Sequence, residues 1–367
     1  PTSLPGQHGI GTFGACARAF VDFLAASGQT LWQMCPLGPT GYGNSPYQSF
    51  SAFAGNALLI DLDVLVEGGW LAASDLEGAP DFPGERVDYP AAIACKMPLL
   101  RKAAANLATC DDALDRLRLD LFGDAHKGWL EDYAFFAALK DHFGGGSWCE
   151  WEDGIRRRQP EAMAHYSGEL ADEIRLQEAL QYFFFSQWQK LKQYANDKGV
   201  KIIGDIPIFV AADSADAWAH PELFEFDEDF RPIRVAGVPP DYFCATGQLW
   251  GNPLYDWERA RATKFAWWIE RIQACLAMSD IVRIDHFRGF VGCWAVPADH
   301  PTAEHGTWEP ALGRELFEAV SHELGELPII AEDLGVITPE VEELRDSNGF
   351  PGMKILQFAF DSAEDND

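Results

Sequence analysis

Residues 281–290 read IVRIDHFRGF, a short apolar run that ends in charged side chains. Two further segments have the same form, KIIGDIPIFV at 201–210 and IIAEDLG at 329–335. Each apolar run has the length and the β-branched composition of a buried strand. Burying a charge is costly unless the group is paired or functional. Charges repeated at three strand ends therefore indicate a reactive site, with helix caps or structural ion pairs as the alternative for any single one.

Amphipathic helices alternate with candidate strands along the chain. The six candidate strands are residues 30–35, 57–62, 201–206, 281–285, 329–332 and 354–360. Apolar stripes at helical spacing precede three of them, at 180–195, 265–276 and 312–324, and Gly199 and Gly325 end the first and the last. This alternation is typical of a parallel α/β fold. We expect a TIM-type (β/α)8 barrel with helical insertions, whose last two strands lie outside this chain. A doubly wound open sheet is the structural alternative, although no GxGxxG motif follows any strand.

The domain organisation follows from the spacing of the strands. Residues 1–62 and 197–367 are predicted to form the catalytic barrel, with strands one and two in the first part and strands three to six in the second. Residues 63–196 read as mostly helical, with polar turns such as FGGGS at 143–147. A βα connection is usually far shorter than this segment. We therefore predict that 63–196 is an inserted helical subdomain.

Composition excludes several classes of partner. The chain has 367 residues, 47% of them hydrophobic, and a formal net charge of −29. Such a charge disfavours nucleic acids and anionic membranes, which are polyanions. The eight cysteines include no CxxC pair, which indicates reduced thiols in a cytoplasmic protein and no zinc site. The sequence contains no run of 18 apolar residues, so no membrane span is expected.

The carboxylates at the strand ends differ in their expected ionisation. Arg283 and Asp285 are two residues apart on a strand, so both face the same side. A neighbouring arginine favours an ionised carboxylate, which suits Asp285 as a nucleophile. Glu332 follows an apolar run and has no cation beside it in the sequence, so we expect a raised pKa and the role of a general acid. Two carboxylates with different ionisation are what a glycosidase requires.

Aromatic side chains in turn-rich loops point to a carbohydrate ligand. Sugar rings present apolar C–H faces, and their hydroxyls need hydrogen bonds. The loops YGNSPYQ at 42–48, PPDYF at 239–243 and GQLWGN at 247–252 place aromatic rings among glycines and prolines. Rings in such loops cannot all pack inward, although most aromatic residues of the chain are expected in the core.

Taken together, these motifs resemble a known family. The segments SLPGQHGIGTFG, PLGPTGYGNSPYQSFSAFAGN, GDIPIFVAADSADAW, PPDYFCATGQLWGNPLYDW, RIDHFRGF and AEDLG are similar to those of the amylomaltase, or disproportionating enzyme, family of 4-α-glucanotransferases, glycoside hydrolase family 77. The resemblance runs from Ser3 to about residue 360. It implies an α-amylase-type barrel with helical insertions, no essential cofactor, and retaining double displacement through a covalent glucosyl-enzyme. The expected partners are α-1,4-glucan donors and acceptors, that is maltooligosaccharides and glucose.

The resemblance also implies roles for individual residues. Asp285 resembles the nucleophile and Glu332 the acid/base. The expected substrate-binding residues are Tyr47, Asp205, Tyr242, Phe243, Gln248, Trp250, Arg283 and His286. The family's third carboxylate, in an HD motif after the seventh strand, has no match here, so no residue is assigned to it.

Three alternatives to transfer remain open at this level. An α-1,4-glucan hydrolase would use the same carboxylates. An inactive fragment that only binds glucan is the second alternative. A metal-dependent barrel enzyme is disfavoured because Asp285 and His286 are adjacent on a strand and cannot both face one site.

Overall fold

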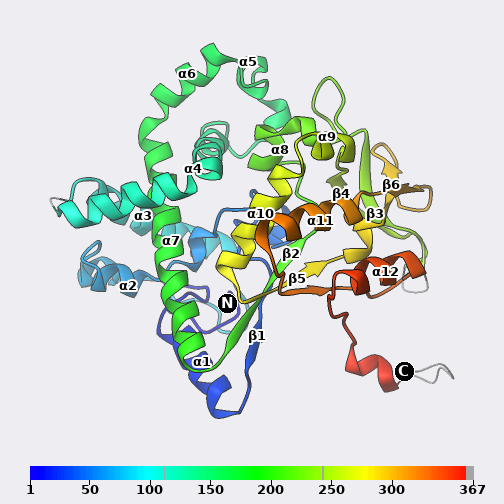
Figure 1. Cartoon of the computed structure of the whole chain (residues 1–367). Coiled ribbons are helices and arrows are strands. Elements are labelled where there is room, and N and C mark those ends of the chain that lie inside the picture. The colour runs from blue at the N-terminus through cyan, green and yellow to red at the C-terminus, as the bar shows by residue number, and fades with distance from the viewer. Residues whose placement is uncertain (111, 242–243, 361–367) are drawn as a thin grey trace. The chain divides into compact units, whose positions relative to one another are not determined.

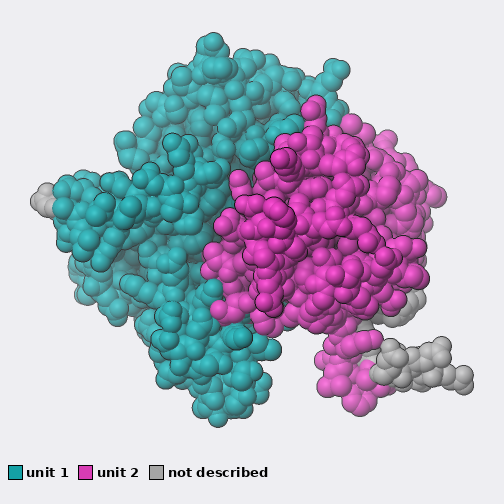
Figure 2. Space-filling model, viewed as in Figure 1, with its two compact units in different colours: residues 1–202, 210–231 teal, residues 203–209, 232–367 magenta. Residues whose placement is uncertain are grey.

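The computed structural model describes residues 1–110, 112–241 and 244–360. The chain divides into two compact units, shown in teal and magenta in Figure 2. Unit 1 consists of Pro1–Ile202 and Val210–Arg231, and unit 2 consists of Ile203–Phe209 and Pro232–Asp367. Strand β2 begins in one unit and ends in the other.

A parallel sheet carries the charged strand ends. It consists of β1 (Leu31–Gln33), β2 (Lys201–Pro207), β5 (Ile281–Asp285) and β8 (Ile329–Ala331), in the order β1-β2-β5-β8. Strands β1, β2 and β5 are labelled in Figure 1. Four of the six expected strands are thereby confirmed. In β5, Val282 and Ile284 are buried on one face, and Arg283 and Asp285 lie together on the other, as the two-residue period requires. The β2–β5 register pairs Asp205 with Arg283.

The helices before three of these strands are also confirmed. They are α7 (Ala171–Asp197), α10 (Ala266–Met278) and α11 (Gly313–Leu324). Gly199 and Gly325 follow α7 and α11 with φ of 78° and 77°, a conformation that favours glycine. The other α-helices described in unit 2 are α9 (Trp257–Ala262) and α12 (Pro339–Ser347). An α/β fold with a parallel sheet is therefore established.

Helices dominate unit 1 (Figure 1). They are α1 (Ala15–Ala26), α2 (Leu62–Glu67), α3 (Tyr89–Ala108), α4 (Ala113–His142), α5 (Asp153–Arg156), α6 (Pro160–Glu169), α7 and α8 (Ala215–Ala219). Helices α4 and α7 pack together through rings, including the contacts of Trp129 and Phe122 with Phe185. The described part of 63–196 contains no strand.

The prediction of a strand at residues 57–62 was wrong. Ala57–Leu59 is a 3-10 helix and α2 begins at Leu62. Two buried glutamines of α7 satisfy the flanking backbone instead of a neighbouring strand. Gln181 accepts from the Gly55 N–H at 2.7 Å and donates to the Gly55 carbonyl at 3.0 Å. Gln187 makes the same pair of bonds to Asp61, at 2.7 and 3.0 Å. Side-chain amides thus replace the strand ladder, which the apolar pattern could not reveal.

The prediction of a strand at residues 354–360 was also wrong. Leu356–Phe360 is a 3-10 helix, and the side chains of Leu356 and Phe360 are exposed. The preceding segment is held by the Ala331 N–H, which donates to the Pro351 carbonyl at 2.9 Å. Among the described residues, no strand pairs with residues 354–360.

A second, antiparallel sheet was not predicted. It consists of β3 (Arg234–Val238), β4 (Gln248–Pro253), β6 (Gly292–Pro297) and β7 (Thr307–Pro310), in the order β4-β3-β6-β7. The β3–β4 register shifts between Val235 and Gly237, and glycines and prolines interrupt the strand pattern. This sheet belongs to unit 2 and carries Gln248 and Trp250, two of the expected site residues.

Candidate active site

Arg283 bridges two carboxylates at the ends of neighbouring parallel strands. Its two terminal nitrogens donate to Asp205 Oδ1 at 2.7 Å and to Asp285 Oδ1 at 2.6 Å. The Asp205 side chain is 2% exposed, that of Arg283 is 13% exposed and that of Asp285 is 31% exposed. The guanidinium is thus a fork that fixes both carboxylates, and Asp285 is the one that remains accessible.

Glu332 follows β8 and is held by backbone N–H groups. Its Oε2 accepts from the His286 N–H at 2.7 Å, and its Oε1 accepts from the Leu334 N–H at 2.9 Å. Burial raises the pKa of Glu332, and Asp285 raises it further, while the two N–H groups and Arg283 oppose the shift. The raised pKa expected from the sequence is confirmed, and its main cause is the expected one, desolvation of the charged form.

The backbone is strained at His286, which follows Asp285 in the chain and bonds to Glu332. His286 has φ of 54° and ψ of 48°, a left-handed conformation that costs a non-glycine residue roughly 1–2 kcal/mol. This turn directs the His286 N–H to Glu332 and follows Asp285 directly in the chain. Strain of this kind persists only where the surroundings hold it, and it gathers at functional sites.

The His286 side chain packs against Trp250. Their ring centroids are 4.8 Å apart and their planes meet at 87°. Burial, with Arg288 nearby, lowers the pKa of His286 to about 4, so the imidazole is neutral at neutral pH. Its Nε2 is buried without a hydrogen-bond partner among the described residues. Gln248 accepts from Trp250 Nε1 at 3.1 Å, which connects the β4 residues to this group.

Met353 is a neighbour of Arg283 that was not identified from the sequence. Met353 Sδ accepts from Arg283 Nε at 3.3 Å. The Met353 N–H donates to Asp333 Oδ1 at 2.7 Å, and Arg345 forms an ion pair with the other oxygen of Asp333. A Cβ on Gly352 would lie 2.2 Å from Asp333 Oδ2, so glycine permits this approach. Asp333 was noted beside Glu332, but no local pattern marks Met353 as a neighbour of Arg283.

Three further site residues were expected from the sequence, Tyr47, Tyr242 and Phe243. Tyr47 lies in unit 1, where its N–H donates to Ser45 Oγ at 3.3 Å. Tyr242 and Phe243 lie outside the described residues. Their contribution to the site stays a prediction.

The described residues contain no group of three or more His, Cys, Asp or Glu side chains that could hold a metal ion. In the same part of the chain, no helix is long and apolar enough to cross a membrane. None of the eight cysteines, all of which are described, forms a disulfide.

Comparison with known proteins identifies the family. A family model described as 4-alpha-glucanotransferase matches residues 1–367. The chain belongs to the 4-alpha-glucanotransferase family. A curated 4-alpha-glucanotransferase from Synechocystis sp. is 53% identical over 100% of this chain and 73% of its own length. The resemblance found in the sequence and the predicted activity, transfer of α-1,4-glucan segments, are thereby confirmed.

Solved structures agree with this family assignment. The amylomaltase from Streptococcus agalactiae in complex with acarbose superimposes with a TM-score of 0.95 at 48% identity, over 100% of this chain and 74% of that chain. The amylomaltase from Corynebacterium glutamicum has a TM-score of 0.79 at 19% identity, over 99% of this chain and 50% of that chain. The second match shows the shared fold. The curated relative is named as a transferase, which favours the glucanotransferase over the hydrolase considered from the sequence.

Proposed function

We propose that Asp285 and Glu332 perform the glucan transfer by retaining double displacement. The observation that supports this most directly is the pair of unlike carboxylates at adjoining strand ends. Arg283 holds Asp285 through a charge-assisted hydrogen bond, whereas burial favours the protonated form of Glu332. One group is suited to attack and the other to donate a proton.

The proposed reaction has two steps. The Asp285 carboxylate attacks the anomeric carbon of the donor, and Glu332 gives its proton to the glycosidic oxygen of the departing chain. An ester to Asp285 results. Glu332, now ionised, then takes the proton of an acceptor 4-hydroxyl, whose oxygen displaces Asp285 and restores an α-linkage. The carboxylates supply the nucleophile and the proton, so the scheme includes no cofactor and no metal. We predict a separation of about 5–5.5 Å between the two carboxyl groups, as retention requires.

The neighbouring side chains are proposed to bind the sugar. The partly exposed Trp250 ring beside His286 offers an apolar face for a glucose unit. The buried Nε2 of neutral His286, which has no partner among the described residues, is available to a sugar hydroxyl. Asp205 and Arg283 act by fixing Asp285, and Gln248 by holding Trp250. Tyr47, Tyr242 and Phe243 are proposed as further glucan contacts. The proposed substrates are maltooligosaccharide donors and acceptors, including glucose.

We further propose that the parallel sheet is part of a (β/α)8 barrel. Three features support this proposal: the strands run parallel, helices precede them, and charged groups lie at their carboxyl ends. The proposed barrel comprises residues 1–62 and 197–367, and 63–196 is the helical insertion. A cytoplasmic location is proposed because the eight cysteines are scattered and unpaired among the described residues.

Azide rescue of two variants tests the assignment of roles. Asp285→Ala and Glu332→Ala are incubated with α-maltotriosyl fluoride and sodium azide, and the anomeric configuration of the product is read by NMR. In Asp285→Ala azide takes the place of the nucleophile, so a β-azide is expected. In Glu332→Ala azide attacks the ester intermediate, so an α-azide is expected. The opposite pair of products would reverse the two roles, and unimpaired transfer from maltotriose in either variant would refute them.

A further inference from the structure

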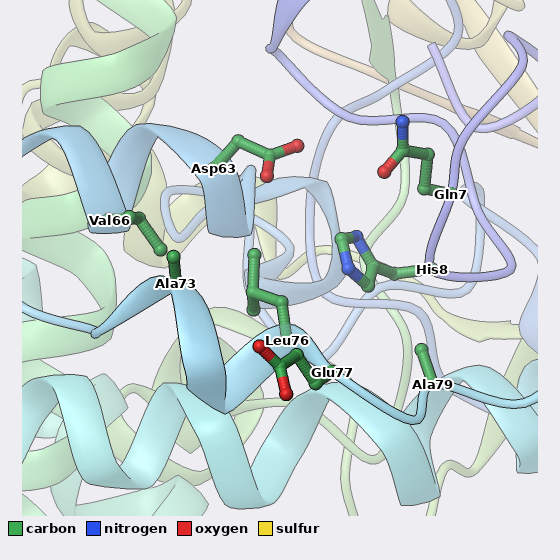
Figure 3. A pocket seen from close by; sticks show the side chains of 8 residues that line it. All are labelled: Gln7, His8, Asp63, Val66, Ala73, Leu76, Glu77 and Ala79. Carbon is green, nitrogen blue, oxygen red and sulfur yellow. The ribbon is translucent and has the colours of Figure 1, made fainter.

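A cavity in unit 1 lies apart in the chain from the residues of the candidate active site. Its volume is about 300 Å³, and all of its lining residues belong to unit 1 (Figure 3). The lining combines polar groups, on Gln7, His8, Asp63 and Glu77, with the apolar side chains of Val66 and Leu76. This volume is at the lower end of the range for small-ligand sites, which is roughly 300–1,000 Å³.

His8 is the unusual member of the lining. Its side chain points into the cavity in Figure 3, yet the residue is only 7% exposed. It has no hydrogen-bond partner among the residues that the structure describes. Its nitrogens are not among the fully buried polar atoms that lack a partner, so they are accessible from the cavity and can bond to a group that enters it.

The protonation state of His8 defines what it can bind. Burial and then the nearby Lys96 lower the pKa of His8, while Asp63 and Asp61 oppose the shift. The imidazole is therefore neutral at neutral pH, with one nitrogen that donates and one that accepts. A hydroxyl group, which also donates and accepts, can satisfy either nitrogen.

The carboxylates of the cavity, Asp63 and Glu77, can accept hydrogen bonds from a ligand. Neither Asp63 nor Glu77 has an ion-pair partner within the described part of the chain. The same residues include no cluster suited to a metal ion, so a single ion would not join His8 to these carboxylates. Asp63 and Glu77 are exposed, so a ligand that carries several hydroxyl donors on one small frame can reach both, and an apolar face of it can lie on Val66 and Leu76.

We propose that this cavity is a second, non-catalytic binding site for a monosaccharide of the glucose class. Hydroxyls of the sugar donate to Asp63 and Glu77 and bond to His8, and the Gln7 amide can bond to another hydroxyl. The C–H face of the ring lies on Leu76 and Val66. The site is independent of the catalytic roles proposed for Asp285 and Glu332.

Histidine NMR on the whole chain tests this site. The protein is labelled with 13C at histidine Cε1, the His8 signal is assigned with His8→Gln, and glucose is added to saturation. The His8 signal is expected to shift saturably, and to do so equally in Trp250→Ala, in which glucose binding at the candidate active site is impaired. Asp63→Asn and Glu77→Gln should each weaken the apparent affinity about tenfold, the effect of replacing a charge-assisted hydrogen bond by one to a neutral amide oxygen.

Controls separate this site from the active site and from non-specific effects. Glu67→Gln, on the same helix as Asp63 but outside the cavity, should bind glucose normally. Leu76→Trp fills the cavity and should abolish the His8 shift, while transfer from maltotriose stays normal in this variant and in Asp63→Asn. A His8 signal that does not shift, or that shifts linearly and equally in all variants, would overturn the proposal. A saturable response to spermidine and none to glucose would assign the cavity to an organic cation instead.

Discussion

Removing the charge of Arg283 should damage stability and turnover together. In Arg283→Met, the side chain no longer donates to Asp205 at 2.7 Å or to Asp285 at 2.6 Å. Asp205 is 2% exposed, so it is left as a buried carboxylate without its cation, which costs about 3–5 kcal/mol of unfolding free energy. Asp285 is 31% exposed and stays hydrated, so the lower end of that range, about 3 kcal/mol, is expected.

Arg283→Lys refines the same prediction. Lysine keeps the charge but has a single nitrogen, which cannot serve both carboxylates in the geometry of the guanidinium fork. The loss of one charge-assisted bond should cost about 1.5–3 kcal/mol. Transfer should fall about 100-fold in this variant, because a nucleophile that is no longer fixed is displaced from its attacking position.

Urea unfolding and the rate of transfer from maltotriose measure the two effects. The matched control is Arg314→Met, which breaks an exposed 2.7 Å pair with Glu343. Such a pair contributes about 0–1 kcal/mol. If Arg283→Met were as stable as Arg314→Met, or Arg283→Lys retained normal turnover, the bridge would not hold the site as we argue.

Three further predictions concern other parts of unit 2 and the interior of unit 1. Because the pKa of Glu332 is raised above its ordinary value of 4.5, the decline of transfer with rising pH should be centred above pH 4.5. This decline should be absent from the residual pH profile of Glu332→Gln. A decline centred at or below pH 4.5 would contradict the role of Glu332 as the acid. Met353→Leu removes the acceptor of the Arg283 Nε–H. This variant should lower kcat about threefold to tenfold with KM unchanged. A change in KM alone would indicate that Met353 contacts the substrate instead. Gln181→Leu leaves the Gly55 N–H and carbonyl unsatisfied in the interior and should cost about 3 kcal/mol in urea unfolding, whereas Gln193→Leu, exposed on the same helix, should cost less than about 0.5 kcal/mol.

Most of the candidate site was predictable because its signals are local. The period of a strand places Arg283 and Asp285 on one face, and the apolar residues around Glu332 predict its raised pKa. Both properties depend on neighbours a few residues away in the chain. The helices at 180–195, 265–276 and 312–324 are of the same kind, since their apolar stripes and terminal glycines lie in continuous segments.

The errors arose where distant segments supply the hydrogen-bond partners. The apolar residues 57–62 read as a strand, but their flanking backbone bonds to Gln181 and Gln187 of α7, more than a hundred residues later. The segment 354–360 has a strand-like composition, yet composition does not provide a neighbouring strand. The antiparallel sheet with Trp250 was missed because glycines, prolines and a register shift obscure its alternation.

The sequence by itself determined the secondary structure around the three charged strand ends, the pairing of Arg283 with Asp285, and the family. Only the tertiary structure decided that β2 and β5 pair in the register that places Asp205 beside Arg283, and that the His286 N–H bonds to Glu332. It also placed Met353 against Arg283 and Trp250 against His286. These contacts join residues that are far apart in the chain. They depend on strand register and packing between elements, which local propensity and periodicity do not specify.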